Sequence, residues 1–356
     1  MAAVSGAEGR GRVYRYGKTR AEAADKLTKA LKLVQDGLPI PGERQTVGQW
    51  LETWLEESAK PAIRPATYAS YSCLVRMHLI PELGHVPLAK LTPQQIQSLL
   101  NRKLASGLAP RRVAMIRGVL RTALNQALRW GLVARNVATL VSPPRASHFE
   151  VRPLDPAQSR AFLDAVRGDR LEALYTVALA IGLRQGEALG LRWEDVELDA
   201  GLLHVRHALQ RIDGKLQLVE PKSARSRRTI VLPDVVRDAL HAHRVRQTEQ
   251  RLAVGAEWEE AGFVFTTELG RPLNDSNVTH MFQRHLKRAG LPRQRFHDLR
   301  HACASLLLAQ GVSPRVVMEV LGHSQITLTL DTYSHVMPGL QADAAARMHA
   351  LLAPSN

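Results

Sequence analysis

Phe296-His297-Asp298-Leu299-Arg300-His301 is the stretch that decides the fold and the chemistry, and Leu321-Gly322-His323 and Thr332-Tyr333 follow it. Far upstream, Gly182-Leu183-Arg184-Gln185-Gly186-Glu187 supplies a second arginine. Two guanidiniums can hold both non-bridging oxygens of a phosphodiester, imidazoles can donate hydrogen bonds or move a proton, and a tyrosine can attack phosphorus. This set predicts phosphoryl-transfer chemistry with no metal and no cofactor.

The length and composition of the chain predict a two-domain globular protein. Its 356 residues exceed one ordinary domain, and a hydrophobic content of 45% is enough to build cores. No apolar run is long enough to span a membrane, and the N-terminus lacks a signal-peptide pattern. The two cysteines, Cys73 and Cys303, are far apart and predict neither a disulfide framework nor a metal motif. We therefore expect a cytoplasmic protein.

The distribution of charge indicates a polyanionic partner. The formal net charge is +15, and no acidic residue occurs from Leu83 to Phe149. A solvated helical face in a neutral domain would interleave Glu with the basic residues, so a phosphate-facing surface is favoured over a merely soluble basic domain. The candidate contacts in this stretch are Arg102, Lys103, Arg111, Arg112, Arg117 and Arg121.

Residues 45–141 are predicted to form a bundle of short helices. Thr92 is expected as a helix N-cap, with Pro93 in the first turn and Gln95 completing a capping box. Proline-rich residues 142–147 break the periodicity, which predicts a linker over 142–153. The expected helices lie at about residues 47–57, 65–79, 93–107 and 110–130.

Residues 154–356 are predicted to form an α+β domain. Residues 212–215 are expected to be the turn between the first two strands. The fold class is therefore mainly α with a small antiparallel β-sheet. The expected helices lie at about residues 155–166, 171–181, 234–251, 276–289, 298–310 and 314–321, and the strands at 201–208, 216–220 and 229–232.

From residue 45 to its end, the chain resembles the tyrosine recombinases of the phage integrase family. That family joins a helical, SAM-like core-binding domain to an α+β catalytic domain, and the motifs here follow the family's order. The resemblance implies a site-specific DNA recombinase of bacteria, needing neither metal nor ATP. The residues that match the family's catalytic positions are Arg184, Glu187, Lys222, His297, Arg300, His323 and Tyr333.

The resemblance assigns a role to each matching residue. Tyr333 is the nucleophile that forms a 3′-phosphotyrosyl link, while Arg184 and Arg300 hold the non-bridging oxygens. His323 donates a hydrogen bond to a phosphate oxygen, and His297 handles a proton or orients the phosphate.

Two further roles concern residues around the arginines. Glu187 supports the arginines or a histidine. Lys222, on a hairpin, protonates the leaving 5′-oxygen. Three nearby arginines are alternatives to Lys222 as phosphate contacts: Arg225, Arg227 and Arg228.

Two rival interpretations remain open at this point. Residues 313–324 have helix–turn–helix spacing, so a non-catalytic DNA-binding regulator is one alternative. A type IB topoisomerase, which shares much of the chemistry, is the other. A regulator would not need Arg184 or the His297/Arg300 pair, and the spacing from His323 to Tyr333 favours recombination.

Residues 1–44 bear on the subtype. They form a short basic segment, with a helix expected over 20–36, and resemble the end of an arm-DNA-binding domain, although the segment is too short for the full three-stranded module. A basic tail with one helix is the alternative. An arm domain favours an integrase of a phage or mobile element over a Xer-like resolvase of chromosome or plasmid dimers.

The resemblance also implies partners. We expect a homotetramer on paired duplex core sites, with arm sites, a directionality factor or a host DNA-bending protein as further partners. An amphipathic helix is predicted after Tyr333. We favour its docking on a neighbouring protomer over folding back in cis.

Overall fold

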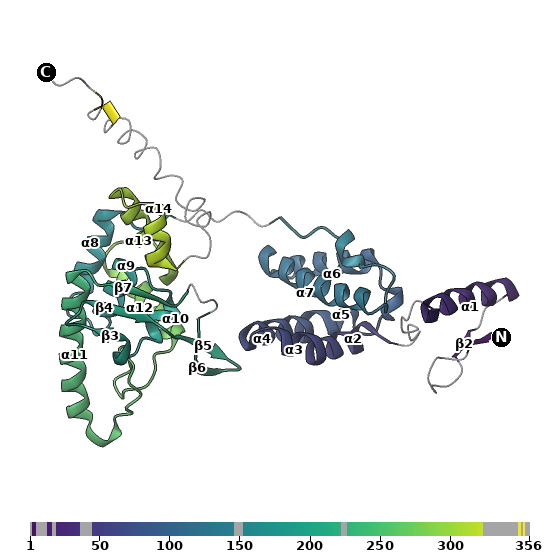
Figure 1. Cartoon of the computed structure of the whole chain (residues 1–356), viewed down its shortest axis with the longest axis horizontal. Coiled ribbons are helices and arrows are strands. Elements are labelled where there is room, and N and C mark those ends of the chain that lie inside the picture. The colour runs from purple at the N-terminus through teal and green to yellow at the C-terminus, as the bar shows by residue number, and fades with distance from the viewer. Residues whose placement is uncertain are drawn as a thin grey trace. The chain divides into compact units, whose positions relative to one another are not determined.

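The computed structural model describes residues 2–4, 13–15, 19–35, 45–145, 152–221, 226–322, 348–349 and 352. The chain divides into two compact units, residues 1–148 and 149–356 (Figure 1). Across the described residues, no helix combines the length and the apolar character that a membrane span requires. The mainly helical fold with small antiparallel sheets that the sequence predicts is confirmed.

The N-terminal residues form two short strands and a helix. Strand β1 (Ala2–Val4) pairs antiparallel with β2 (Val13–Arg15), and α1 (Arg20–Gln35) follows. The last residue of the predicted helix 20–36 lies outside the described residues.

The rest of the first unit is a helical bundle. Its α6 begins with the predicted capping box, in which Gln95 N donates to Thr92 Oγ1 at 3.3 Å and Thr92 N donates to Gln95 Oε1 at 3.0 Å. The helices are α2 (Val47–Thr53), α3 (Lys60–Ala62), α4 (Pro65–Leu74), α5 (Ile80–Leu83), α6 (Pro93–Ala105) and α7 (Pro110–Arg129), with 3-10 turns at Leu88–Lys90 and Val137–Leu140.

Two π-helical segments connect helices that continue beyond their predicted ends. Trp54–Ala59 joins α2 to α3, and Val75–Leu79 joins α4 to α5. Each is followed by a Xaa-Pro pair, with Pro61 and Pro81 as the prolines. Proline lacks an N–H and clashes with the carbonyl four residues earlier, and the wider π turn gives both groups room. Helices that the sequence predicts to end before these prolines therefore continue through them.

The second unit packs around α9 (Glu172–Ala180), which contacts α8, α10, α11 and α13 (Figure 1). Phe162, Tyr175, Phe282 and Phe296 form a buried aromatic cluster beside it. The other helices are α8 (Pro156–Ala165), α10 (Gln185–Leu189), α11 (Asp234–Val254), α12 (Asp275–Arg288), α13 (Phe296–Ala309) and α14 (Pro314–Leu321), with 3-10 turns at Trp193–Asp195 and Gly255–Glu257.

The β structure differs in part from the prediction. In place of the predicted strand 201–208, β4 (Leu202–Val205) pairs with β7 (Arg228–Val231) and with a strand that was not predicted, β3 (Val196–Glu197). Ala208 begins a further strand, β5 (Ala208–Ile212), most of which lies beyond the predicted one. Strand β5 pairs with β6 (Lys215–Val219) in a separate hairpin. The turn falls where expected, with Asp213 at φ 49° and Gly214 at φ 79°, as a two-residue turn between twisted strands requires.

Candidate active site

The end of α9, the middle of α13 and the end of α14 meet at Gly182. This glycine has φ 64°, in the left-handed region. A Cβ added to it would lie 2.4 Å from Leu321 Cδ2 and 3.2 Å from Cys303 Sγ, so only glycine lets these helices approach so closely. The turn places Arg184 as the N-cap residue of α10.

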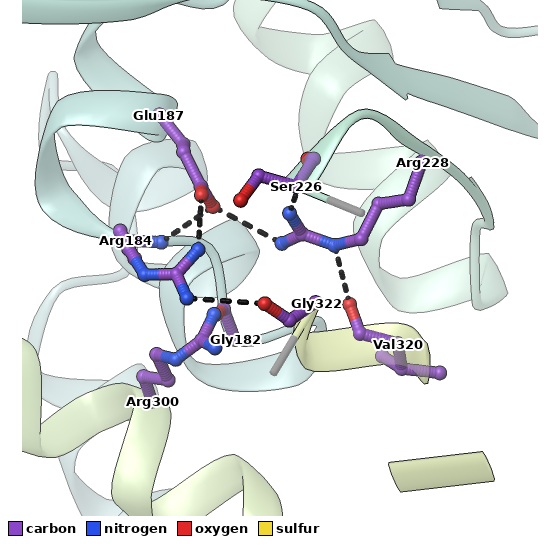
Figure 2. A network of polar contacts seen from close by, with 8 residues as sticks. All are labelled: Gly182, Arg184, Glu187, Ser226, Arg228, Arg300, Val320 and Gly322. Carbon is purple, nitrogen blue, oxygen red and sulfur yellow. Dashed lines mark hydrogen bonds and ion pairs between the residues drawn. The ribbon is translucent and has the colours of Figure 1, made fainter. Parts of the chain in front are cut away.

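Arg184 is held by two partners at its guanidinium (Figure 2). Its Nη1 lies 2.6 Å from Glu187 Oε1, and its Nη2 donates to the carbonyl of Gly322 at 3.1 Å. The Arg184 side chain is 37% exposed, whereas that of Glu187 is 4% exposed. Arg184 is therefore fixed on its inner side and still open to a ligand.

Arg300 approaches the same turn from α13. Its side chain is buried, and its Nη1 donates to the Gly182 carbonyl at 2.8 Å. The structure thus brings together two arginines that the sequence separates by more than a hundred residues. Each guanidinium donates to a backbone carbonyl, that of Arg300 to Gly182 and that of Arg184 to Gly322.

Glu187 is the acidic centre of this arrangement. Burial by itself would raise the pKa of Glu187, but the charges of Arg228 and Arg184 outweigh burial and lower the pKa below its usual value. Glu187 is therefore ionised at neutral pH. Its carboxylate can therefore orient Arg184 and Arg228.

Arg228 lies in a different environment from the one the sequence suggests. We expected it to face phosphate, but its side chain is only 7% exposed and bonds to Glu187 and to two backbone carbonyls. The alternation of side chains along β7 could have predicted that Arg228 points inward. Arg228 is two residues from the buried Ile230 and therefore shares its face of the strand. Arg228 belongs to the interior network of Figure 2.

His297 and His301 stand one turn apart on α13, with ring centroids 5.1 Å apart. The His297 side chain reaches the surface of the described chain. Its pKa still falls to about 4, because part of the ring is withdrawn from water and because His301, Arg300 and Arg184 lie near it. Burial also lowers the pKa of His301. Both imidazoles are therefore neutral at pH 7 and can donate or accept a hydrogen bond.

Four candidate residues lie outside the described residues: Lys222, Arg225, His323 and Tyr333. Two of them, His323 and Lys222, directly follow a described residue. Gly322, which accepts from Arg184, directly precedes His323 in the sequence, and Pro221 directly precedes Lys222.

The other candidate DNA contacts lie mainly on α6 and α7. Arg102 and Lys103 both bond to Glu82, at 2.7 and 2.8 Å. Arg111 and Arg121 are exposed, whereas Arg112 is half-buried.

Two candidates remain, in different units. Arg117 is half-buried, and burial followed by the charge of Arg121 lowers its pKa. In the second unit, Arg227 is exposed and paired with Glu220 at 2.6 Å. Within the parts of the chain that the structure describes, no cluster of three or more His, Cys, Asp or Glu side chains suits a metal ion.

Comparison of the sequence with known families gives two matches. The profile of the Phage integrase family matches residues 152–339, and the profile described as Phage integrase, N-terminal SAM-like domain matches residues 46–104. These matches cover both units.

Two curated relatives align over most of the chain. A protein named Tyrosine recombinase XerC-like, from Caldanaerobacter subterraneus subsp. tengcongensis, is 32% identical over 94% of this chain and 91% of its own. An Integrase from Saccharopolyspora erythraea is 29% identical over 86% of this chain and 83% of its own.

Two solved structures share the fold. The Tn1549 transposon integrase in complex with transposon right end DNA has a TM-score of 0.71 at 24% identity, covering 87% of this chain and 100% of that one. A lambda integrase tetramer bound to a Holliday junction has a TM-score of 0.60 at 19% identity, covering 89% and 88%. More than half of the chain matches the family profile, and one relative is 32% identical over nearly its full length. The chain therefore belongs to the phage integrase family and is a tyrosine recombinase.

Proposed function

We propose that this recombinase is an integrase that cleaves and rejoins duplex DNA through Tyr333. The observation that carries the proposal is the pair of arginines at one turn. Arg300 is bonded to Gly182, and Arg184 is bonded to Gly322, which directly precedes His323. Preorganised guanidiniums of this kind stabilise the charge that develops on a phosphoryl group under attack.

The proposed reaction has two balanced steps. The Tyr333 hydroxyl oxygen attacks the scissile phosphorus in line, the bond to the 5′-oxygen breaks, and a 3′-phosphotyrosyl link forms. Arg184 and Arg300 hold the non-bridging oxygens, His323 donates a hydrogen bond to one of them, and Lys222 protonates the leaving 5′-oxygen. A 5′-hydroxyl from another strand then displaces the tyrosine. The phosphotyrosine conserves the bond energy, so rejoining needs no ATP.

Neutral His297 fits the handling of a proton in this scheme. Its pKa of about 4 in the DNA-free chain makes it a weak base, but a phosphodiester anion beside it would raise that pKa and let the imidazole take the proton that the tyrosine loses. Glu187 keeps Arg184 oriented from behind.

The test is capture of the covalent intermediate. The full-length protein is incubated with a pool of duplexes that carry a nick within randomised sequence, so that cleavage releases a short strand and traps the adduct. We expect an adduct that survives detergent, with the DNA on the peptide that contains Tyr333. Sequencing the attached DNA identifies the site.

Two variants complete that experiment. Tyr333→Phe is expected to form no adduct. Tyr175→Phe is the matched control, because the buried Tyr175 hydroxyl has no hydrogen-bond partner within the described residues, and it is expected to react like the wild type. An adduct that persists in Tyr333→Phe would refute the assignment of the nucleophile.

A Xer-like resolvase is the second candidate, because one relative carries that name. The same adducts separate the two functions. An integrase acts on two different sites, one on the element and one on the host chromosome, whereas a resolvase acts on two copies of one site. Recovery of a single site sequence, with exchange between two copies of it, would favour the resolvase.

The N-terminal residues support the integrase reading. We propose that β1, β2 and α1 bind DNA at arm sites apart from the core. Deletion of residues 1–40 is expected to reduce integration while adduct formation on the core site continues. Unchanged integration would remove this proposal.

For the partners, we propose duplex DNA and a homotetramer, as in the lambda integrase complex on a Holliday junction. The helix predicted after Tyr333, most of which lies outside the described residues, is proposed to dock on the neighbouring protomer. The predicted helix–turn–helix segment holds α14 (Pro314–Leu321), whose Val320 carbonyl accepts a hydrogen bond from Arg228. We place the enzyme in the bacterial cytoplasm, on DNA, with a directionality factor or host bending protein as further partners.

A further inference from the structure

Arg228 joins three segments of the chain in the second unit (Figure 2). It begins β7, and its Nε donates to the Val320 carbonyl of α14 at 2.7 Å. Its Nη2 donates to Glu187 Oε2 of α10 at 3.0 Å, and its Nη1 to the Ser226 carbonyl at 3.2 Å. Every nitrogen of the guanidinium therefore has an internal partner.

The contact with Glu187 acts on Arg184. One carboxylate serves both arginines, with Oε1 receiving Arg184 Nη1 and Oε2 receiving Arg228 Nη2. Oε2 also accepts from the backbone N of Arg184 at 3.1 Å. A carboxylate held at both oxygens cannot rotate, so the Arg184 guanidinium keeps one orientation.

The contact with Val320 acts on the end of α14. The last carbonyls of a helix lack partners within it, and Arg228 supplies one for Val320. Gly322 lies directly on the guanidinium, because a Cβ added there would be 3.0 Å from Arg228 Nη1. Its carbonyl accepts from Arg184. The two arginines thus hold residues 320 and 322, immediately before His323.

We propose that Arg228 is a positioning residue for strand cleavage. It fixes Glu187, and through Glu187 the guanidinium of Arg184, relative to the end of α14. The inference rests on the proposed function. It departs from a phosphate-contact role, because a side chain with only 7% exposure offers no surface to DNA. It also predicts that charge alone is insufficient, since one ammonium cannot reach the Glu187 carboxylate and the Val320 carbonyl together.

The test separates DNA binding from cleavage. Affinity is measured by fluorescence anisotropy in a Tyr333→Phe background, on the nicked duplex whose sequence the wild-type adducts provide. The rate of adduct formation is measured in a single turnover at saturating protein. We expect Arg228→Ala to leave the Kd nearly unchanged and to slow adduct formation about 100-fold, the loss that a misplacement of about 1 Å causes.

Two further measurements distinguish positioning from general damage. Arg228→Lys is expected to be intermediate, because it keeps the charge at Glu187 and loses the bond to α14. Added millimolar guanidinium is expected to speed Arg228→Ala and not the wild type, since the ion can occupy the vacated space beside Glu187. If Arg228→Ala fails to fold, the adduct rate of Arg228→Lys is compared with that of the wild type instead. Equal rates for Arg228→Lys and the wild type would overturn the proposal.

Arg206→Ala is the matched control. Arg206 pairs at 2.9 Å with another buried carboxylate, that of Asp195, so its loss also exposes a buried acid. We expect a lower unfolding temperature and an unchanged adduct rate. An equal rate loss in Arg206→Ala, or a loss of affinity in Arg228→Ala that accounts for its slower reaction, would overturn the inference. Absence of an adduct with the wild type would instead refute the proposed function.

Discussion

Two sets of arginines, one in each compact unit, lie in opposite environments. On α7 of the first unit, Arg111 and Arg121 are exposed, within a stretch that has no acidic residue from Leu83 to Phe149. In the second unit, Arg184, Arg228 and Arg300 are each bonded to backbone carbonyls of the chain. An exposed arginine contributes charge and can adapt to any phosphate, whereas a fixed one offers a single geometry. If the proposed function holds, the arginines of the first unit would contribute to affinity for DNA and those of the second to binding of the transition state.

The largest effect on the adduct rate should come from Arg184→Lys, which keeps the positive charge and removes the planar guanidinium. Arg184→Lys cannot bond to both Glu187 and Gly322, nor hold two phosphate oxygens. We expect its adduct rate at saturating protein to fall about 10²–10³-fold, the loss typical of one missing transition-state donor. The Kd for the nicked duplex should change little.

Arg237→Lys serves as the control for that variant. Arg237 pairs with Asp234 on α11, away from the network of Figure 2, and its lysine variant should react like the wild type. If Arg184→Lys weakens binding as much as it slows cleavage, the two units do not differ as described.

A second prediction concerns packing. Gly182→Ala should destabilise the protein by about 1–3 kcal/mol, because its φ is positive and its new Cβ would meet Leu321 and Cys303. Gly107→Ala, in the first unit, has a similar φ of 89° but nothing within 4 Å of the new Cβ, so it should cost less. Equal losses in urea unfolding would show that backbone strain alone, rather than the meeting of helices at Gly182, sets the cost.

A third prediction tests the exposed arginines. Arg121→Ala should weaken binding to all duplexes alike and reduce the slope of log K against log salt by about 1. The adduct rate of the saturated complex should stay the same, because Arg121 contributes only charge. A slower saturated rate would mean that the first unit also orients the scissile phosphate.

The smallest effect should appear in acid. The pKa of His297 is lowered to about 4, so between its ordinary value and that value the unfolded chain binds more protons than the folded one. Stability therefore falls as pH decreases through this window. His297→Asn should lose less stability than the wild type between pH 7 and about 5, as unfolding temperatures would show. A wild type and variant that respond alike would contradict the lowered pKa.

The sequence predicted most of the fold because its signals are local. Capping at Thr92 and the turn at Asp213-Gly214 depend on neighbouring residues, and both appear as expected. The π-helical turns were missed because proline normally ends a helix, and only tertiary packing decides otherwise. Strand 201–208 was predicted too long for a similar reason, since β4 pairs with β3 and β7 whereas Ala208 already begins β5 of a separate hairpin.

The candidate site could also be predicted only in part, because some of its contacts depend on tertiary structure. The motif predicted Arg184, Glu187 and Arg300, and the structure brings them together, although their roles remain proposals. Arg228 was misjudged because a cluster of basic residues resembles a DNA-binding surface in sequence. Only the contacts with Glu187 and Val320 distinguish an interior arginine from an exposed neighbour such as Arg227.

The network of Figure 2 has a consequence for stability. It holds three positive side chains, Arg184, Arg228 and Arg300, against the one negative charge of Glu187. Positive charge concentrated in a partly buried place opposes folding until an anion joins it. A phosphodiester that binds only the folded chain would offset that repulsion, and folding and substrate binding would then be thermodynamically linked. The DNA that this enzyme is proposed to cut would then also act as a ligand that stabilises its fold.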